Sequence, residues 1–252
     1  LAMVGCPTTA QRLQQPRQLF YDNQIESAHA QLEKLADKHG RDETVIELDL
    51  AMADLVRGDP ANAERRLREV RDRWDHLEQA SAVESATSML TDDQRRAYSG
   101  EDYEKLLVRT FLSLSSLMQD GVDAESYALQ LLDKHEKLQV QAGQRWGPTA
   151  SQAYTPPAIG FYVRGLLREA THSNYDDALR AYELTASFLP DPTFVQHDIL
   201  RVSQGVHSHK GNGVLYVFAL VGRGPYKVEV AEQATSDALL IADRIVSVMG
   251  QY

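Results

Sequence analysis

Residues 159–190 read IGFYVRGLLREATHSNYDDALRAYELTASFLP, and this stretch decides the fold. Its apolar residues recur at helical spacing on both sides of Ser173 and Asn174, whose short polar side chains suit a turn. After the turn, Ala178 offers a small side chain where two helices approach most closely. Tyr182 follows one turn later and can fill the groove between them. The stretch therefore predicts a helical hairpin.

The same spacing occurs twice more near the N-terminus. A turn residue, then a small residue, then a large residue are found at Asn23, Ala28 and Leu32, and again at Gly58, Ala63 and Leu67. The two alanines lie about one tetratricopeptide-repeat period, roughly 34 residues, apart. An ordinary helical bundle is the alternative, since any packed helices need small and large residues. We favour the repeats and expect a mainly α fold, a tetratricopeptide-like superhelix of helical hairpins.

The rest of the chain divides into segments of different character. Residues 1–15 predict a signal remnant and tether, 16–75 the N-terminal hairpins, 76–100 a linker or irregular helix, 101–204 the central repeats, and 205–252 a β-hairpin with a C-terminal helix. Within the central repeats, the glycines and prolines of 139–157 predict a long loop or a frayed helix end.

The predicted β-hairpin depends on two runs near the C-terminus. Residues 214–221 form an unbroken apolar run typical of a strand that is buried on both faces. Residues 226–230 alternate between apolar and polar side chains, as a half-exposed strand does, and 222–225 have the composition of a turn. A lone hairpin is marginally stable, so we expect it to pack on the helices or to pair with other strands.

The composition of the chain excludes several classes of protein. The chain has 252 residues, of which 43% are hydrophobic, enough for a sizeable core. Its formal net charge of -10 repels nucleic acid, so no nucleic-acid partner is expected. The single cysteine, Cys6, excludes a disulfide framework and a zinc site built on several thiolates. No run reaches the roughly 18 apolar residues that a membrane-spanning helix needs.

The chain opens with a short apolar segment that places a small residue directly before the cysteine, Leu1-Ala2-Met3-Val4-Gly5-Cys6. This pattern is typical of the end of a bacterial lipoprotein signal, and it predicts that Cys6 carries lipid and attaches the protein to a membrane. The alternative is a short buried N-terminal segment with an incidental cysteine.

Four groups of residues, in this order, carry a family resemblance: Gly5-Cys6; Tyr98 with Gly100-Glu101-Asp102-Tyr103-Glu104; Gly165-Leu166 through Asp176-Asp177-Ala178; and Gly222-Arg223-Gly224-Pro225-Tyr226-Lys227-Val228-Glu229. Together they resemble a family of uncharacterised bacterial tetratricopeptide-repeat-type lipoproteins. The resemblance implies an extracytoplasmic, membrane-anchored helical repeat protein with a small β element. It supplies no reaction and no catalytic residues.

Three histidines, His197, His207 and His209, come nearest to a metal cluster. His207 and His209 are two residues apart, so in an extended segment they project to one side and could share a divalent ion if a third ligand arrived. A polar loop that contains histidines by chance is the simpler explanation. We expect neither a metal nor a cofactor.

Acidic residues gather where the middle helix is expected to begin. Glu101, Asp102 and Glu104 could act as paired carboxylates, but acidic residues in a first helical turn also cap its free amides and complement its dipole, by about 0.3 to 1 kcal/mol each. Capping is the favoured interpretation. Partner contacts by Glu101, Asp102 and Tyr103 remain open, as does a contact by Arg223 at the tip of the predicted β-hairpin.

No Gly-x-Ser-x-Gly or comparable pattern supports nucleophilic catalysis, and no catalytic residue is assigned. We expect a protein-binding scaffold of the bacterial cell envelope, lipid-anchored, facing the periplasm at the outer membrane. Another envelope protein or peptide would lie in the concave face of the superhelix. The alternatives are a hydrolytic or metal-dependent envelope enzyme that uses the histidine region 197–209, and a purely structural lipoprotein.

Overall fold

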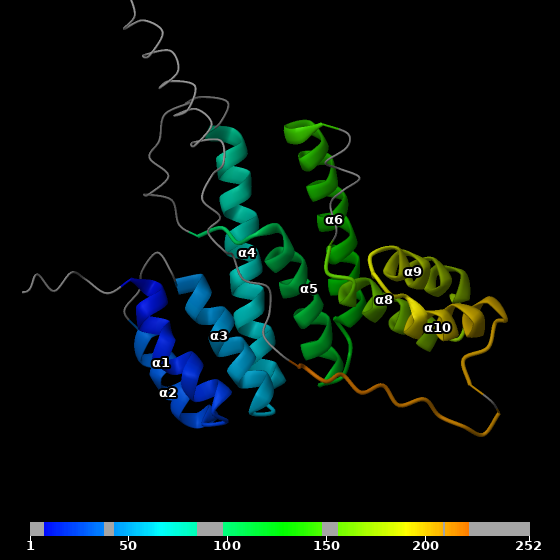
Figure 1. Cartoon of the computed structure of the whole chain (residues 1–252), viewed down its shortest axis with the longest axis horizontal. Helices are drawn as coiled ribbons and strands as arrows, with labels where there is room; N and C mark the ends of the chain where they lie inside the picture. The colour runs from blue at the N-terminus through cyan, green and yellow to red at the C-terminus, as the bar shows by residue number, and fades with distance from the viewer. Residues whose placement is uncertain (1–7, 38–42, 85–97, 148–155, 209, 222–252) are drawn as a thin grey trace, which may run out of the picture. The chain divides into compact units, whose positions relative to one another are not determined.

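The computed structural model describes residues 8–37, 43–84, 98–147, 156–208 and 210–221 (Figure 1). Helices account for most of these residues, and none of them lies in a strand, so the expected mainly α class is confirmed. The helices are α1 (Thr9–Tyr21), α2 (Ile25–Ala36), α3 (Glu43–Val56), α4 (Pro60–Glu84), α5 (Asp102–Leu117), α6 (Ala124–Trp146), α8 (Ile159–Ala170), α9 (Tyr175–Ser187) and α10 (Thr193–Ser203). The chain forms two compact units, Leu1–Asn212 and Gly213–Tyr252, and all of these helices belong to the first.

Each of these helices packs chiefly against the one before it and the one after it. This order holds from α1 to α6 and from α8 to α10, with α6 packed on α8. Helix α1 also contacts α3, and α5 also contacts α8. The buried core of the first unit therefore follows the order of the helices along the chain.

Left-handed turn residues join the helices of the first two predicted hairpins. The backbone φ is 59° at Asn23 and 77° at Gly58, a conformation that asparagine and glycine tolerate best. Five residues after each turn, Ala28 and Ala63 are fully buried. The spacing seen in the sequence thus marks real turns and real helix contacts.

The hairpin of α8 and α9 shows the same arrangement with a small shift. The left-handed residue is His172, with φ of 56°, one position before the predicted Ser173. Ala178 and Tyr182 are both fully buried. A Cβ added at Gly165 would lie 2.4 Å from the ring of Tyr182, so α8 approaches this ring as closely as a glycine allows.

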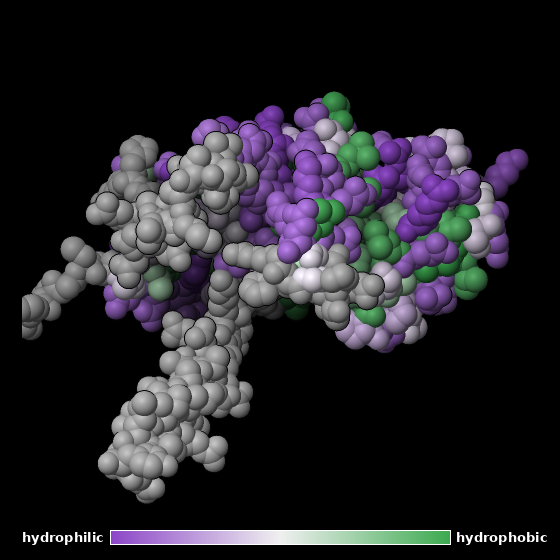
Figure 2. Space-filling view, turned by 90° about the horizontal axis from the view of Figure 1, so that it is seen from above, coloured by the Kyte–Doolittle hydropathy of each residue, from purple (hydrophilic) through white to green (hydrophobic). Residues whose placement is uncertain are grey.

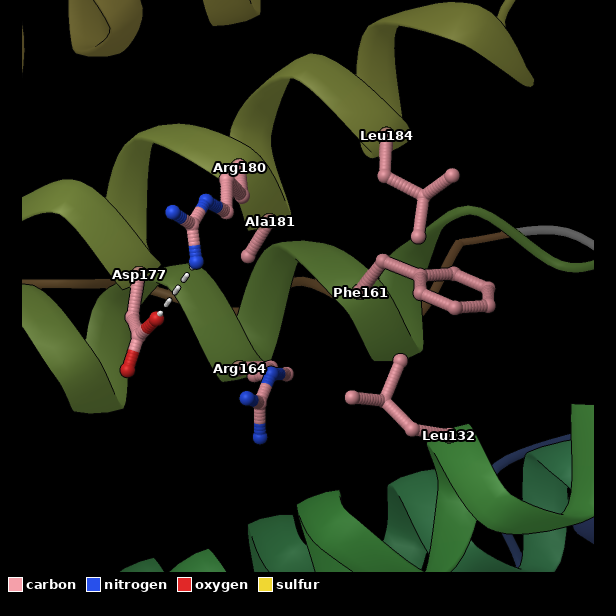
Figure 3. A pocket seen from close by; sticks show the side chains of 7 residues that line it. All are labelled: Leu132, Phe161, Arg164, Asp177, Arg180, Ala181 and Leu184. Atoms are coloured by element: carbon pink, nitrogen blue, oxygen red, sulfur yellow. Dashed lines mark ion pairs between the residues drawn. The ribbon is translucent and has the colours of Figure 1, made fainter.

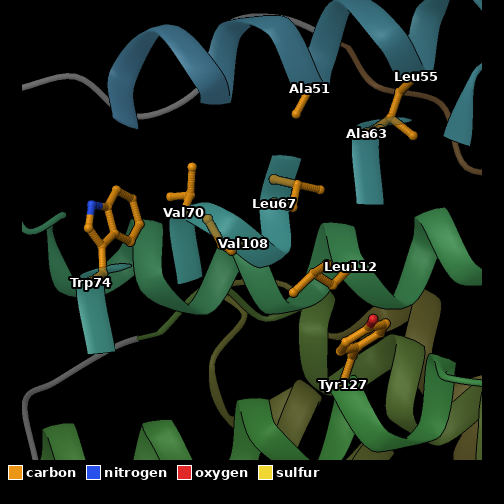
Figure 4. Packing of buried hydrophobic residues seen from close by; sticks show 9 residues of the cluster. All are labelled: Ala51, Leu55, Ala63, Leu67, Val70, Trp74, Val108, Leu112 and Tyr127. Carbon is orange, nitrogen blue, oxygen red and sulfur yellow. The ribbon is translucent and has the colours of Figure 1, made fainter. Parts of the chain in front are cut away.

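The largest described core cluster surrounds α4 (Figure 4). It joins residues of four successive helices, Ala51 and Leu55 of α3, Ala63, Leu67, Val70 and Trp74 of α4, Val108 and Leu112 of α5, and Tyr127 of α6. Burial of such apolar area is the main source of stability, at about 25 cal/mol per Å². Helix α4 therefore holds the first half of the helical series together.

The predicted tether within residues 1–15 is wrong where the structure describes it, because α1 begins at Thr9. Thr8 and Gln11 form a reciprocal capping box, in which the Thr8 amide donates to Gln11 Oε1 at 2.8 Å. The apolar face of the helix is anchored by Leu13, which is 1% exposed and packs in a cluster with Leu32, Ile46 and Leu50. The capping box and the burial of Leu13 support the part of the helix upstream of Pro16.

Two helices run beyond their predicted ends. Helix α4 continues to Glu84, so the first part of the predicted linker 76–100 is helical. Helix α6 continues to Trp146 and ends at Gly147, where φ is 90°, so of the two alternatives for 139–157 the long loop is wrong for residues 139–146. Residues 148–155 lie outside the described residues. The polar and small residues in both places weaken the apolar period without breaking the helix.

The predicted buried strand at 214–221 is also wrong. This segment has no strand structure, and Leu215, Val217 and Val221 are 85%, 80% and 89% exposed. Strand preference expresses packing on neighbouring strands, so the apolar composition of this run does not by itself determine a strand. The second predicted strand, 226–230, and Arg223 lie outside the described residues, as does Cys6.

None of the described helices is both long enough and apolar enough to cross a membrane.

Candidate functional site

The acidic residues predicted as partner contacts lie together at the start of α5, where they cap the helix. Glu101 is the N-cap residue, and its amide donates to Glu104 Oε2 at 2.8 Å in a reciprocal capping box. The hydroxyl of Tyr98 donates to the same Glu104 oxygen. Capping, the favoured interpretation, is confirmed for Glu101 and Glu104, while partner contact by Asp102 and Tyr103 stays a prediction.

Next to this helix start, a cluster of charges joins α4, α5 and α6, with buried cations and half-buried carboxylates. Arg109 Nη2 donates to both carboxylate oxygens of Asp75, at 2.6 and 2.8 Å, and Lys134 Nζ lies 3.2 Å from the same carboxylate. Lys105 Nζ lies 2.7 Å from Glu78. Burial would raise the pKa of Asp75, but Arg109 and Lys134 outweigh it and hold that pKa below its ordinary value. These ion pairs join three helices and serve the fold, although Arg109 Nε has no hydrogen-bond partner among the described residues.

The histidine region does not assemble as a metal site in the part of the chain that the structure describes. His197 is exposed on α10, and His209 lies outside the described residues. His207 instead directs Nδ1 at Glu169 Oε1, 2.9 Å away. Among the described residues, no group of three potential ligands is placed to hold an ion.

Glu169 is the centre of a second buried cluster, near the C-terminal end of α8. Its carboxylate is 0% exposed and accepts hydrogen bonds from Tyr182 Oη at 2.7 Å and from Arg201 Nε and Nη2, both at 2.7 Å, besides its contact with His207. Burial would raise its pKa, but these donors lower it below the ordinary value. The cluster ties α8, α9, α10 and the segment after α10 to one carboxylate.

A pocket of about 210 Å³ lies between α6, α8 and α9 (Figure 3). It is lined by Leu132 of α6, by Phe161 and Arg164 of α8, and by Asp177, Arg180, Ala181 and Leu184 of α9. Figure 3 shows the apolar side chains gathered at one end and the charged ones at the other, with Ala181 between them. The pocket is therefore amphipathic along its length.

The apolar end is built on Phe161, which is fully buried. The Phe161 ring lies 5.0 Å from His135 and 5.2 Å from Phe188, measured between ring centroids, and it belongs to a core cluster against which Leu132 and Leu184 pack. The floor of the pocket is therefore part of the hydrophobic core.

Seen from above (Figure 2), hydrophobic residues come to the surface mainly on the right, the side where Figure 1 shows α8, α9 and α10.

The charged end carries an excess of positive charge. Asp177 pairs with Arg180 at 3.5 Å, and Arg168 pairs with Glu125 of α6. Arg164 has a buried nitrogen, Nη1, for which the described residues offer no hydrogen-bond acceptor. Burial lowers the pKa of Arg164, and the adjacent Arg168 cation lowers it further. Among the residues that line the pocket, Arg164 and Arg180 face one carboxylate, Asp177, so one positive charge is unbalanced.

Sequence reasoning missed this pocket. Phe161 and Arg164 are three residues apart and so share a helix face, a signal that the sequence does carry. Nothing local shows that Arg164 lacks an acceptor, because its neighbours come from α6 and α9.

Comparison with protein-family models, with curated proteins and with solved structures finds no significant match to this chain. The resemblance to tetratricopeptide-type lipoproteins therefore stays a prediction.

Proposed function

We propose that this chain is a protein-binding scaffold, built as a tetratricopeptide-like superhelix and without catalytic chemistry of its own. Support comes from the packing of each helix on its neighbours and from left-handed turns that are followed by buried alanines. Stacked hairpins of this kind leave a concave face suited to a peptide or helix of another envelope protein.

The pocket between α6, α8 and α9 is the observation that carries the proposal. Its volume of about 210 Å³ is below the roughly 300 to 1,000 Å³ of pockets for small-molecule ligands and cofactors. It is large enough for one side chain of a partner, and its lining combines an apolar floor with charged groups. A side-chain-sized, amphipathic pocket on a helical series favours peptide binding over substrate turnover.

Site-specific photocrosslinking tests the proposal. The residue p-benzoylphenylalanine replaces Arg180, whose side chain is 78% exposed at the rim of the pocket. The matched control replaces Arg65 on α4, which is 47% exposed. We expect one recurrent protein adduct in intact cells from position 180 and none from position 65. Equal adducts from both positions, or none from either, would contradict a scaffold that binds through this pocket.

We further propose that lipid on Cys6 holds the scaffold in the bacterial envelope, facing the periplasm. The motif Gly5-Cys6 supports this proposal. Cys6→Ser should move the full-length protein from the membrane fraction to the soluble fraction. An unchanged distribution would remove the anchor without affecting the binding proposal.

A further inference from the structure

Within the proposed scaffold function, the pocket also defines the chemistry of its ligand. The apolar end, formed by Leu132, Phe161 and Leu184, excludes a charged group from the floor. The other end is lined by two arginines, Arg164 and Arg180. A ligand that satisfies both ends has an apolar group and an anion, separated by only a few bonds.

Charge decides which ion the polar end accepts. Arg164 has a buried donor nitrogen without an acceptor among the described residues. The charged side chains that line the pocket, Arg164, Arg180 and Asp177, leave one positive charge in excess. A buried donor left unpaired is unfavourable, and the carboxylate of a peptide matches the planar fork of a guanidinium. An anionic ligand thus supplies the acceptor that Arg164 lacks and the negative charge that balances the pocket.

The small volume decides how the two groups are connected. In an extended peptide, successive side chains point to opposite sides, so an acidic residue and its apolar neighbour cannot both enter a pocket of about 210 Å³. In the last residue of a chain, by contrast, the side chain and the carboxylate share one Cα. A single residue then fills both ends of the pocket.

We propose that the pocket between α6, α8 and α9 binds the carboxyl-terminal residue of a partner protein, provided that this residue has an apolar side chain. The side chain lies on Phe161 between Leu132 and Leu184, and the terminal carboxylate accepts hydrogen bonds from Arg164 and Arg180.

Fluorescence polarisation with four labelled peptides tests the proposal. The probe is fluorescein-Gly-Ser-Gly-Ser-Leu with a free carboxylate. The comparisons are the same peptide with a terminal amide, the same peptide ending in lysine, and an isomer with leucine in the third position. We expect the free acid to bind at least tenfold more tightly than each of the others, because a charge-assisted hydrogen bond contributes about a factor of ten or more.

Variants of the protein assign the effect to the pocket. Arg164→Gln should remove the preference for acid over amide, and Arg164→Lys should restore part of it. Arg180→Gln should weaken binding of the free acid severalfold. The Arg180 side chain is exposed, so this variant should fold normally. Arg65→Gln, on α4, should change nothing. A melting curve of each variant confirms that it is folded.

Equal binding of acid and amide, or no saturable binding of the probe up to millimolar peptide, would overturn the proposal. The photocrosslinking experiment tests the scaffold function independently of the carboxyl-terminal preference. An adduct from position 180 together with equal acid and amide binding leaves the scaffold function standing and removes only the carboxyl-terminal preference.

Discussion

Helix α8 carries two charged side chains that stand in opposite situations. Glu169 is fully buried, and its carboxylate receives donors from α9, α10 and the segment after α10. Arg164, five residues earlier, has a buried nitrogen that no described residue pairs. The comparison contrasts a carboxylate that finds its partners within the fold with a guanidinium that belongs to a pocket lining and retains a donor for a group from outside.

The strongest way to break this comparison is to remove Glu169. Glu169→Ala leaves Arg201, Tyr182 and His207 without their common acceptor. We expect a loss of about 3 kcal/mol in the free energy of unfolding, the low end for a broken buried ion pair, because Arg201 is 27% exposed and regains some water. Urea unfolding at pH 7 measures it. In the control, Glu125→Ala, the removed carboxylate is 41% exposed, and the loss should stay below about 1 kcal/mol. Equal losses in the two variants would refute the structural role of Glu169.

A smaller loss of stability is expected when the close contact between Gly165 and the Tyr182 ring is disturbed. In Gly165→Ala the new methyl group would lie 2.4 Å from the Tyr182 ring, which must move. Overpacking costs about 1 to 3 kcal/mol, and the better helix propensity of alanine offsets about 1 kcal/mol of it, so a net loss of about 1 kcal/mol is expected in urea unfolding. Gly213→Ala, with open space around the added atom, is the matched control. A stabilised Gly165→Ala protein would show that the two helices are packed less closely than they are described.

Acid titration sharpens the role of Glu169 further. Its pKa in the folded protein lies below the ordinary value of 4.5, so its contribution to stability is complete above that value. The contribution is lost as the pH falls through the lower, folded pKa. Between pH 5 and pH 3, the stability of the wild-type protein should therefore fall more steeply than that of Glu169→Gln, whose amide does not titrate. Parallel curves in urea unfolding would argue that the carboxylate gains nothing from its donors.

Local sequence patterns were sufficient for the hairpins and insufficient at the ends of elements. The hairpin of α8 and α9 was predictable because its apolar period and its small residue Ala178 are both local. The first turn of α1 was missed, although Thr8 and Gln11 have the spacing of a capping box. The strand at 214–221 failed for a different reason, since a strand depends on a partner that its own residues do not specify.

The polar clusters lie beyond local reasoning because their members are far apart in the chain. Arg201 is 32 residues and His207 38 residues from Glu169, so no short motif connects them. The acidic start of α5 was predicted correctly as a cap because Glu101 and Glu104 interact within one helical turn. The pocket combines the two cases, with Phe161 and Arg164 on one helix face and the remaining lining residues supplied by α6 and α9.

The smallest expected change in stability, and the sharpest test of the comparison, comes from Arg164→Met. Methionine keeps an unbranched apolar stem and removes a buried nitrogen that has no acceptor among the described residues, so the free energy of unfolding should change by no more than about 0.5 kcal/mol or should rise. The same variant should lose the preference for a free carboxylate, whereas Glu169→Ala should lose stability. Urea unfolding measures Arg164→Met beside Glu169→Ala. A loss of more than about 2 kcal/mol in Arg164→Met would place Arg164 among the structural charges. Removing a charge lowers the free energy of unfolding by that much only when the charge has partners inside the fold.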